Sequence, residues 1–159
     1  MVGIADVNAE LLRTMAQEYH IPNTYTSYRD LLKSQPDLVS IALPNYLHAP
    51  ATIDALKAGV HVLCEKPIAV NQQQAREMLA KAKSTGLTAM VAHEFRFAPG
   101  RAYVSELLEQ GFIGDPLSIS ITLFLSMPRP APGQPPRPVH RGSSGALGAL
   151  GSHYIDCMR

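Results

Sequence analysis

The chain has 159 residues, 46% of them hydrophobic, which excludes a wholly disordered chain and leaves room for one domain and part of another. Its 14 basic and 13 acidic residues give a net charge of +1, so no charge signal indicates binding to nucleic acid or to an anionic membrane. No apolar run approaches the roughly 20 residues that cross a bilayer. The two cysteines, Cys64 and Cys157, form neither a disulfide framework nor a metal-ligand pattern, and no signal peptide is visible, so we expect a cytoplasmic protein without a metal centre.

Apolar runs and helical patterns alternate along the first 92 residues. Short apolar runs bounded by turn residues predict buried strands at 2–5, 38–43, 60–64 and 87–92. Good N-cap residues predict helices after Asn8, Ser27 and Asn71, and a further helix is predicted from His48 until shortly before Gly59. Such alternation with short loops predicts a parallel sheet with helices packed on its faces, joined by right-handed crossovers. The predicted fold class is therefore α/β.

Polar residues gather where the predicted strands end. The carboxyl ends of parallel strands share one edge of a sheet, and an open α/β sheet binds ligands beyond that edge. Glu65 and Lys66 are the sharpest case, because they directly follow a buried strand and precede a proline. The same edge is expected to carry Asp6, Pro44, Asn45 and His93. This convergence predicts a ligand site, and a weakly coupled surface ion pair of Glu65 with Lys66 is the alternative.

The pattern changes after His93. A helix is predicted over residues 101–110. Residues 117–123 alternate apolar and hydroxyl side chains, as a half-buried strand of an antiparallel or mixed sheet does. Residues 128–138 hold six prolines and are predicted to form a loop, and small residues from 145 onward predict another helix start. A second domain is therefore expected after residue 93.

Four ordered motifs make the chain resemble one enzyme family. They are Pro44-Asn45-Tyr46-Leu47-His48, Ala58 to Pro67, Phe95-Arg96-Phe97, and Gly145 to Asp156. In order and spacing they resemble the Gfo/Idh/MocA family of NAD(P)-dependent oxidoreductases. The resemblance implies a Rossmann-type NAD(P)-binding domain at residues 1–93, with helices on both faces of its parallel sheet. At residues 94–159 it implies the start of an α/β, open-sheet domain for substrate binding and oligomerisation.

The resemblance also implies a reaction and roles for single residues. The reaction would move a hydride between nicotinamide and a sugar, inositol or related polyol, in a full-length protein that is a homo-oligomer. Lys66 and His153 would be catalytic, with His153 exchanging the proton of the reacting hydroxyl. Asp6 would bond the ribose hydroxyls and repel a 2′-phosphate, so NAD is expected rather than NADP. Cofactor contacts are implied for Asp6, Pro44, Asn45, His48, Glu65, Lys66 and Arg96.

The chain also departs from the family pattern. It has no glycine-rich G-x-G-x-x-G turn for the pyrophosphate, which in the family precedes the position of Met1. We therefore expect an internal fragment whose Rossmann domain lacks the first strand, a central one, and the glycine loop, and whose second domain continues beyond Arg159. Ala149 stands where the family often has an aspartate four residues before the catalytic histidine, while Asp156 lies three residues after it.

Plainer interpretations stay open for several of these residues. Asp6 can be only a turn former, His48 only a residue at a helix N-terminus, and His93 only a strand-end histidine with structural bonds. Cys64 is expected to be unreactive, because burial raises the pKa of a thiol.

Three functions are compatible with the sequence. The first is a nicotinamide-dependent dehydrogenase of sugars or polyols. The second is a non-catalytic fragment that binds the cofactor poorly. The third is a cofactor-binding or regulatory module that has lost its redox chemistry, which the alanine at position 149 would permit.

Overall fold

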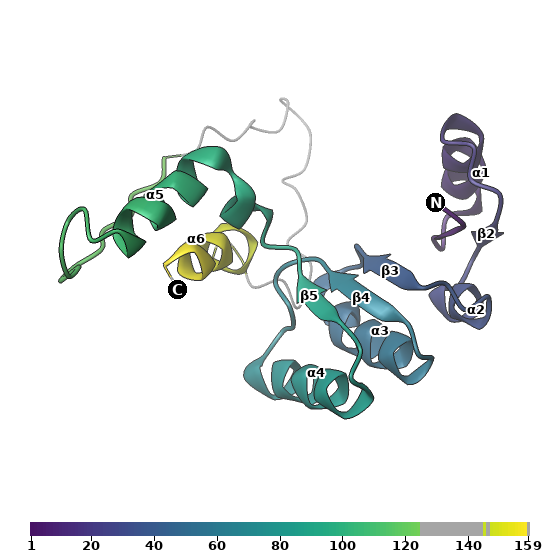
Figure 1. Cartoon of the computed structure of the whole chain (residues 1–159). Helices are drawn as coiled ribbons and strands as arrows, with labels where there is room; N and C mark the ends of the chain where they lie inside the picture. Colours follow the sequence, from purple (N-terminus) through teal and green to yellow (C-terminus); the bar gives the residue numbers. More distant parts are fainter. Residues whose placement is uncertain (125–144, 146, 159) are drawn as a thin grey trace. The chain divides into compact units, whose positions relative to one another are not determined.

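The computed structural model describes residues 1–124, 145 and 147–158, and the predicted proline-rich loop at 128–138 lies outside them (Figure 1). The chain divides into two compact units, Met1–Ala92 and His93–Arg159. Within the described part of the chain, no helix has both the length and the apolar character that a membrane span needs.

The first unit holds parallel strands in two sheets. Strand β1 (Ile4–Ala5) pairs with β2 (Thr24–Tyr25), and the second sheet has the order β3 (Leu38–Ile41), β4 (His61–Cys64), β5 (Ala89–Val91). The two-residue strand β2 was not predicted. In the doubly wound order a further strand lies between these two groups. Among the described residues no strand pairing joins the two sheets.

Local signals set the helices of this unit. These are α1 (Ala9–Glu18), α2 (Tyr28–Lys33), α3 (Asn45–Lys57) and α4 (Gln72–Thr85). The side chains of Asn8, Ser27 and Asn71 accept hydrogen bonds from first-turn N–H groups of α1, α2 and α4, as predicted. Gly59 follows α3 with φ +83° in the left-handed region that glycine tolerates. Helix α3 begins three residues earlier than predicted, directly after Pro44.

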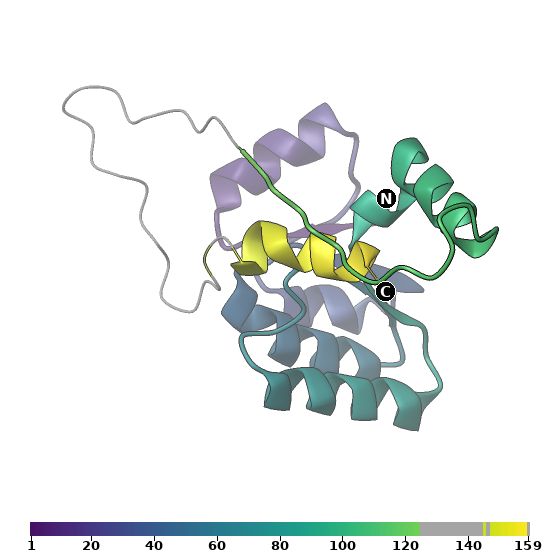
Figure 2. The same cartoon turned by 90° about the vertical axis from the view of Figure 1, so that its left-hand side faces the viewer.

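The main core lies between β3-β4-β5 and the helices α3 and α4, which run side by side in both views (Figures 1 and 2). Leu56 of α3 and Val62 of β4 are each only 1% exposed, and Met78 of α4 is buried beside them. Burial of each such side chain contributes about 2 kcal/mol of hydrophobic stabilisation. The next residue, Leu79, is 55% exposed, because Met78 occupies the core position of that turn. This packing fixes the carboxyl end of β4, where the predicted site begins.

The second unit is mostly helical in its described residues. It contains η1 (Glu94–Phe97), α5 (Pro99–Glu109), the π-helix η2 (Leu147–Gly151) and α6 (Ser152–Cys157).

One prediction for this unit is wrong within the described residues. Residues 117–123 form no strand, and Leu117 is 98% exposed. A strand needs a paired neighbour to be stable, and no described residue pairs with this segment. Val104 and Leu108 of α5 are exposed, because no described element covers that side of the helix.

Candidate functional site

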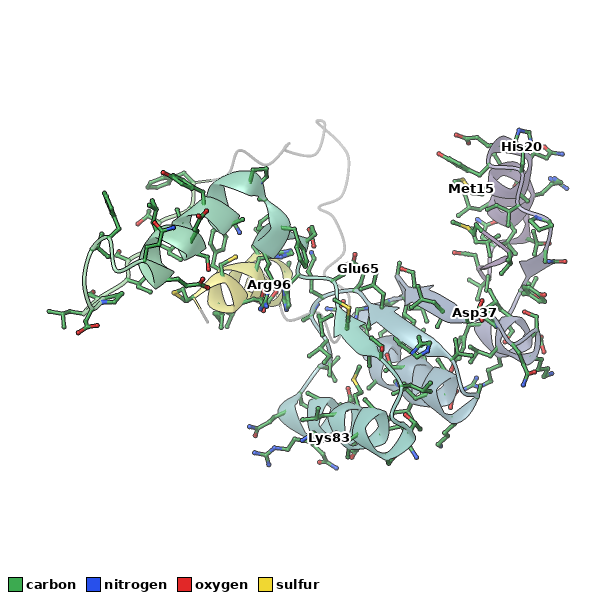
Figure 3. All side chains as sticks on the ribbon, viewed as in Figure 1. Met15, His20, Asp37, Glu65, Lys83 and Arg96 are labelled. Carbon is green, nitrogen blue, oxygen red and sulfur yellow. The ribbon has the colours of Figure 1, made fainter. Side chains whose placement is uncertain are left out.

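The carboxyl ends of strands β3 and β4 bring two of the predicted site segments to one edge of the sheet. Ile41 pairs with Cys64 in register, and the N–H of Glu65 donates to the carbonyl of Ile41 at 2.9 Å. The segment Pro44-Asn45 leaves β3 at this edge, with Pro44 at the N-cap of α3 and Asn45 as its first residue. Glu65, labelled in Figure 3, follows β4 at the same edge, and Lys66 is the next residue. The predicted convergence of these residues is therefore present.

Glu65 and Lys66 form a bonded, half-buried corner. The Glu65 carboxylate accepts a hydrogen bond from the backbone N–H of Lys66 at 3.2 Å, and the following Lys66–Pro67 peptide bond is cis. The Glu65 side chain therefore folds back on the loop after β4, and its carboxylate lies beside the backbone nitrogen of Lys66.

His48 lies under this edge, inside the protein. Its side chain is only 1% exposed. Ring atom Nδ1 is 2.8 Å from the carbonyl oxygen of Pro67, and Nε2 is 2.7 Å from the carbonyl oxygen of Leu43. The ring thus connects the segment after β4 with the segment after β3.

Asp6 follows β1 and is exposed. One of its carboxylate oxygens accepts a hydrogen bond from the N–H of Asn8 at 2.7 Å. This is the turn-forming bond that the sequence allowed, and it stabilises the entry into α1. Because the carboxylate also faces solvent, the turn role and the predicted ribose contact are compatible.

His153 is the centre of a cluster in the second unit. Its side chain is 2% exposed, and the Phe95 ring stacks on it at 4.1 Å with a 25° angle between the planes. The ring of His93 meets it edge-on at 5.5 Å. Glu94 places a carboxylate oxygen 3.7 Å from Nε2 of His153. The predicted catalytic histidine is therefore held by η1, the segment that directly follows β5.

Arg96 ties the same two segments together. Its guanidinium donates to both carboxylate oxygens of Asp156 in α6, at 3.1 and 2.7 Å, and this hydrogen-bonded carboxylate raises the pKa of Arg96. Arg101 of α5 lies over the rings of Phe95 and Tyr154 at 4.3 and 4.9 Å. These contacts give Arg96 a structural role in the second unit, and its predicted cofactor contact stays a prediction.

Sequence reasoning missed Glu94 and Phe95 as neighbours of His153. The signal that was available is the Phe95-Arg96-Phe97 motif, which pointed to this segment but not to its partner almost 60 residues further on. Glu94 supplies a carboxylate near His153, which the chain does not have at Ala149.

Cys64 ends β4 directly before Glu65. Burial raises the pKa of the Cys64 thiol, and the neighbouring Glu65 carboxylate adds to this, in agreement with the expected inertness.

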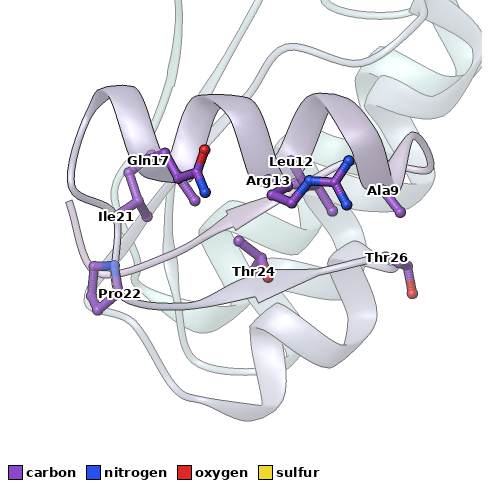
Figure 4. A pocket seen from close by; sticks show the side chains of 9 residues that line it. Ala9, Leu12, Arg13, Gln17, Ile21, Pro22, Thr24 and Thr26 are labelled. Atoms are coloured by element: carbon purple, nitrogen blue, oxygen red, sulfur yellow. The ribbon is translucent and has the colours of Figure 1, made fainter.

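A hollow of about 430 Å³ lies against α1 and β2 and is lined by Leu12, Arg13 and their neighbours (Figure 4). It contains none of the predicted site residues. Among the described residues no group of His, Cys, Asp and Glu is arranged to hold a metal ion.

Parallel strands with helical crossovers and polar residues at the strand ends define a protein of the Rossmann type. Residues 1–93 match the sequence description of an oxidoreductase family with a NAD-binding Rossmann fold. The chain belongs to this family, Gfo/Idh/MocA, as the four motifs had indicated.

Several relatives are named dehydrogenases. The chain is 35% identical to levoglucosan dehydrogenase of Pseudarthrobacter phenanthrenivorans over 98% of its own length and 41% of that enzyme. It is 40% identical to mouse trans-1,2-dihydrobenzene-1,2-diol dehydrogenase over 72% of its length and 35% of that enzyme. It thus spans about two fifths or less of these curated relatives.

Solved structures agree with the family assignment. Levoglucosan dehydrogenase in complex with NADH superposes with a TM-score of 0.80 at 29% identity, covering 99% of this chain and 43% of that one. Scyllo-inositol dehydrogenase from Lactobacillus casei with bound NAD(H) and scyllo-inositol gives a TM-score of 0.70 at 25% identity, covering 72% and 34%. The fold of the described residues is therefore that of dehydrogenases in this family.

Proposed function

We propose that the protein is an NAD-dependent oxidoreductase that transfers a hydride between nicotinamide and a hydroxyl-bearing carbon of a sugar, inositol or related polyol. The observation that carries the proposal is the sheet edge where Glu65-Lys66 and Pro44-Asn45 meet, in a chain that matches an NAD-binding oxidoreductase family. The names of relatives support the substrate class, since they include levoglucosan dehydrogenase and 1,5-anhydro-D-fructose reductase. A cytoplasmic location and a homo-oligomeric assembly are sequence-based predictions that we retain.

The residues of the first unit fit NAD at two of its parts. The exposed carboxylate of Asp6 can accept hydrogen bonds from ribose hydroxyls and would repel a 2′-phosphate, which favours NAD over NADP. Pro44, Asn45 and Glu65 line the edge between β3 and β4 and would bound the cofactor's path. When bound, nicotinamide would supply the acceptor or donor of the hydride.

Lys66 and His153 would handle the proton and the charge of the reacting hydroxyl. The Lys66 ammonium would stabilise negative charge on the substrate oxygen, and the His153 imidazole would take or return the hydroxyl proton. The carboxylate of Glu94, 3.7 Å from the ring, would stabilise the imidazolium that results. Lys66 and Glu94 would thus each stabilise a charge that develops during the reaction, while His153 would transfer the proton.

Two measurements test the proposal with the purified protein. NADH binding is followed by the change in NADH fluorescence, and turnover by nicotinamide absorbance in the presence of NAD and either levoglucosan or scyllo-inositol. We expect NADH to bind more tightly than NADPH and at least one of these substrate classes to be oxidised. Binding without turnover on any sugar or polyol would overturn the oxidoreductase and favour a binding module. Failure to bind NADH would overturn the cofactor assignment.

A further inference from the structure

His48 has an unusual set of partners for a core side chain. It sits in the first turns of α3, is 1% exposed, and has a backbone carbonyl within 2.8 Å of each ring nitrogen. Both distances fall in the range of good hydrogen bonds. A carbonyl oxygen only accepts, so each of these bonds needs an N–H on the ring nitrogen that faces it.

The two carbonyls belong to the two segments that form the sheet edge. Leu43 lies between β3 and α3, and Pro67 directly follows Lys66. Proline has no backbone N–H, so Pro67 can be held in place only by a hydrogen bond to its carbonyl oxygen or by packing of its ring. The bond from His48 to Pro67 therefore replaces an anchor that an ordinary residue could provide with its own N–H.

Lys66 is held between two such anchors. On one side the N–H of Glu65 donates to Ile41 of β3 at 2.9 Å. On the other side the carbonyl of Pro67 is bonded to His48 of α3. The backbone of Lys66 is thus fixed from both directions, which sets the point from which its side chain departs. Displacement of a reacting group by about 1 Å can lower a rate about 100-fold.

We infer that His48 is a positioning residue that holds the Glu65-Lys66-Pro67 segment and thereby fixes Lys66. Burial and the engagement of both ring nitrogens direct its side chain into the scaffold, so it acts through Lys66 and makes no contact with the cofactor. The kinetic part of this inference rests on the proposed function, while the anchoring part does not.

A matched pair of substitutions separates the two bonds. The amide nitrogen of asparagine reaches about the position of histidine Nδ1, and that of glutamine reaches about the position of Nε2. His48→Asn therefore keeps the donor to Pro67, and His48→Gln keeps the donor to Leu43. Thr52→Ala, in the same helix one turn on and 2% exposed, is the control for a general loss of core packing.

Hydrogen–deuterium exchange is measured on the fragment that covers residues 65–70, and kcat and the KM for NAD are measured alongside. We expect about tenfold faster exchange in His48→Gln and nearly unchanged exchange in His48→Asn and Thr52→Ala. In the same His48→Gln variant kcat should fall about 100-fold while the KM for NAD changes less than about threefold. Equal exchange in both His48 variants would overturn the anchoring role, and a rise in KM alone would overturn positioning in favour of cofactor contact.

A third measurement does not depend on the folding of any variant. In the NMR spectrum of the unsubstituted protein, the Nδ1–H proton of His48 should be protected from solvent and show a nuclear Overhauser effect to residues 67 and 68. Absence of this proton or of these contacts would overturn the anchor. If the protein shows no turnover at all, the proposed function fails, but exchange and NMR still decide whether His48 holds the segment.

Discussion

The hydrogen bond between Tyr28 and Asp54 gives a sharp test of how the two sheets of the first unit are held together. Helix α2 packs against β1 and β2 on one side and against α3 on the other, so it bridges the two separate sheets. The Tyr28 hydroxyl donates to the Asp54 carboxylate of α3 at 2.9 Å, and Nε of Arg29 donates to the same oxygen at 3.1 Å. Asp6 follows β1 in one sheet, and Lys66 follows β4 in the other. Loss of the bond between Tyr28 and Asp54 should therefore loosen the position of Asp6 relative to Lys66.

The magnitude follows from burial. A hydrogen bond to a charged group contributes about 1.5–3 kcal/mol when well buried. The Asp54 side chain is 29% exposed, so we expect Tyr28→Phe to lower the free energy of unfolding by only about 1–1.5 kcal/mol. Arg29 is 64% exposed, and Arg29→Ala should cost less than about 0.5 kcal/mol. For a chain of this size the Tyr28→Phe change corresponds to a fall in Tm of about 4 °C.

Urea unfolding of a double-mutant cycle measures this bond directly. The single variants Tyr28→Phe and Asp54→Ala and their combination should give a coupling free energy of about 1 kcal/mol. Burial, together with the hydrogen bond to Asp54, raises the pKa of Tyr28, so its stabilising effect should fade as the pH rises above about 10. A coupling below about 0.3 kcal/mol would refute the view that this bond joins the two sheets.

Four further predictions concern charge and access. Glu94→Gln should lower kcat/KM about tenfold, with partial recovery in Glu94→Asp, and equal rates in all three proteins would contradict a role for its charge. Asp6→Ala should raise the Kd for NADH about 10- to 100-fold but leave that for NADPH nearly unchanged, as fluorescence titration can check. Because burial raises the pKa of Cys64, the folded state keeps this thiol protonated, and stability should fall as the pH rises above about 8.5; Cys64→Ala should flatten that fall in urea unfolding. Iodoacetamide should modify the exposed Cys157 first, and faster labelling of Cys64 would contradict its burial.

Local signals in the sequence were enough for most of the first unit. Asn8, Ser27 and Asn71 each accept N–H groups within three residues, so their capping bonds can be foreseen from short patterns. The alternation of strands and helices predicted the parallel sheet, and its edge predicted the meeting of Asn45 with Glu65. These features depend on neighbours in sequence or on a general rule for parallel sheets.

Features that depend on distant partners could not be predicted. The carbonyl bonds of His48 reach residues 5 and 19 positions away, and the Phe95–His153 stack joins segments that no local pattern connects. The alternation in residues 117–123 describes a strand, but a strand also needs a partner, and none is present among the described residues. Sequence pattern therefore predicted the sheet edge and the polar residues that follow its strands, while the bonds that hold these residues required the structure.

The rate of NADH formation by Lys66→Ala tests the central claim most directly. Wild-type protein, Lys66→Ala and the control Lys83→Ala, which removes an exposed lysine of α4, are compared with NAD and levoglucosan or scyllo-inositol. We predict that Lys66→Ala loses at least about 1,000-fold in kcat while its affinity for NADH stays within about threefold, and that Lys83→Ala matches the wild type. Turnover by Lys66→Ala at the wild-type rate would contradict the assignment of Lys66 and, with it, the proposed site.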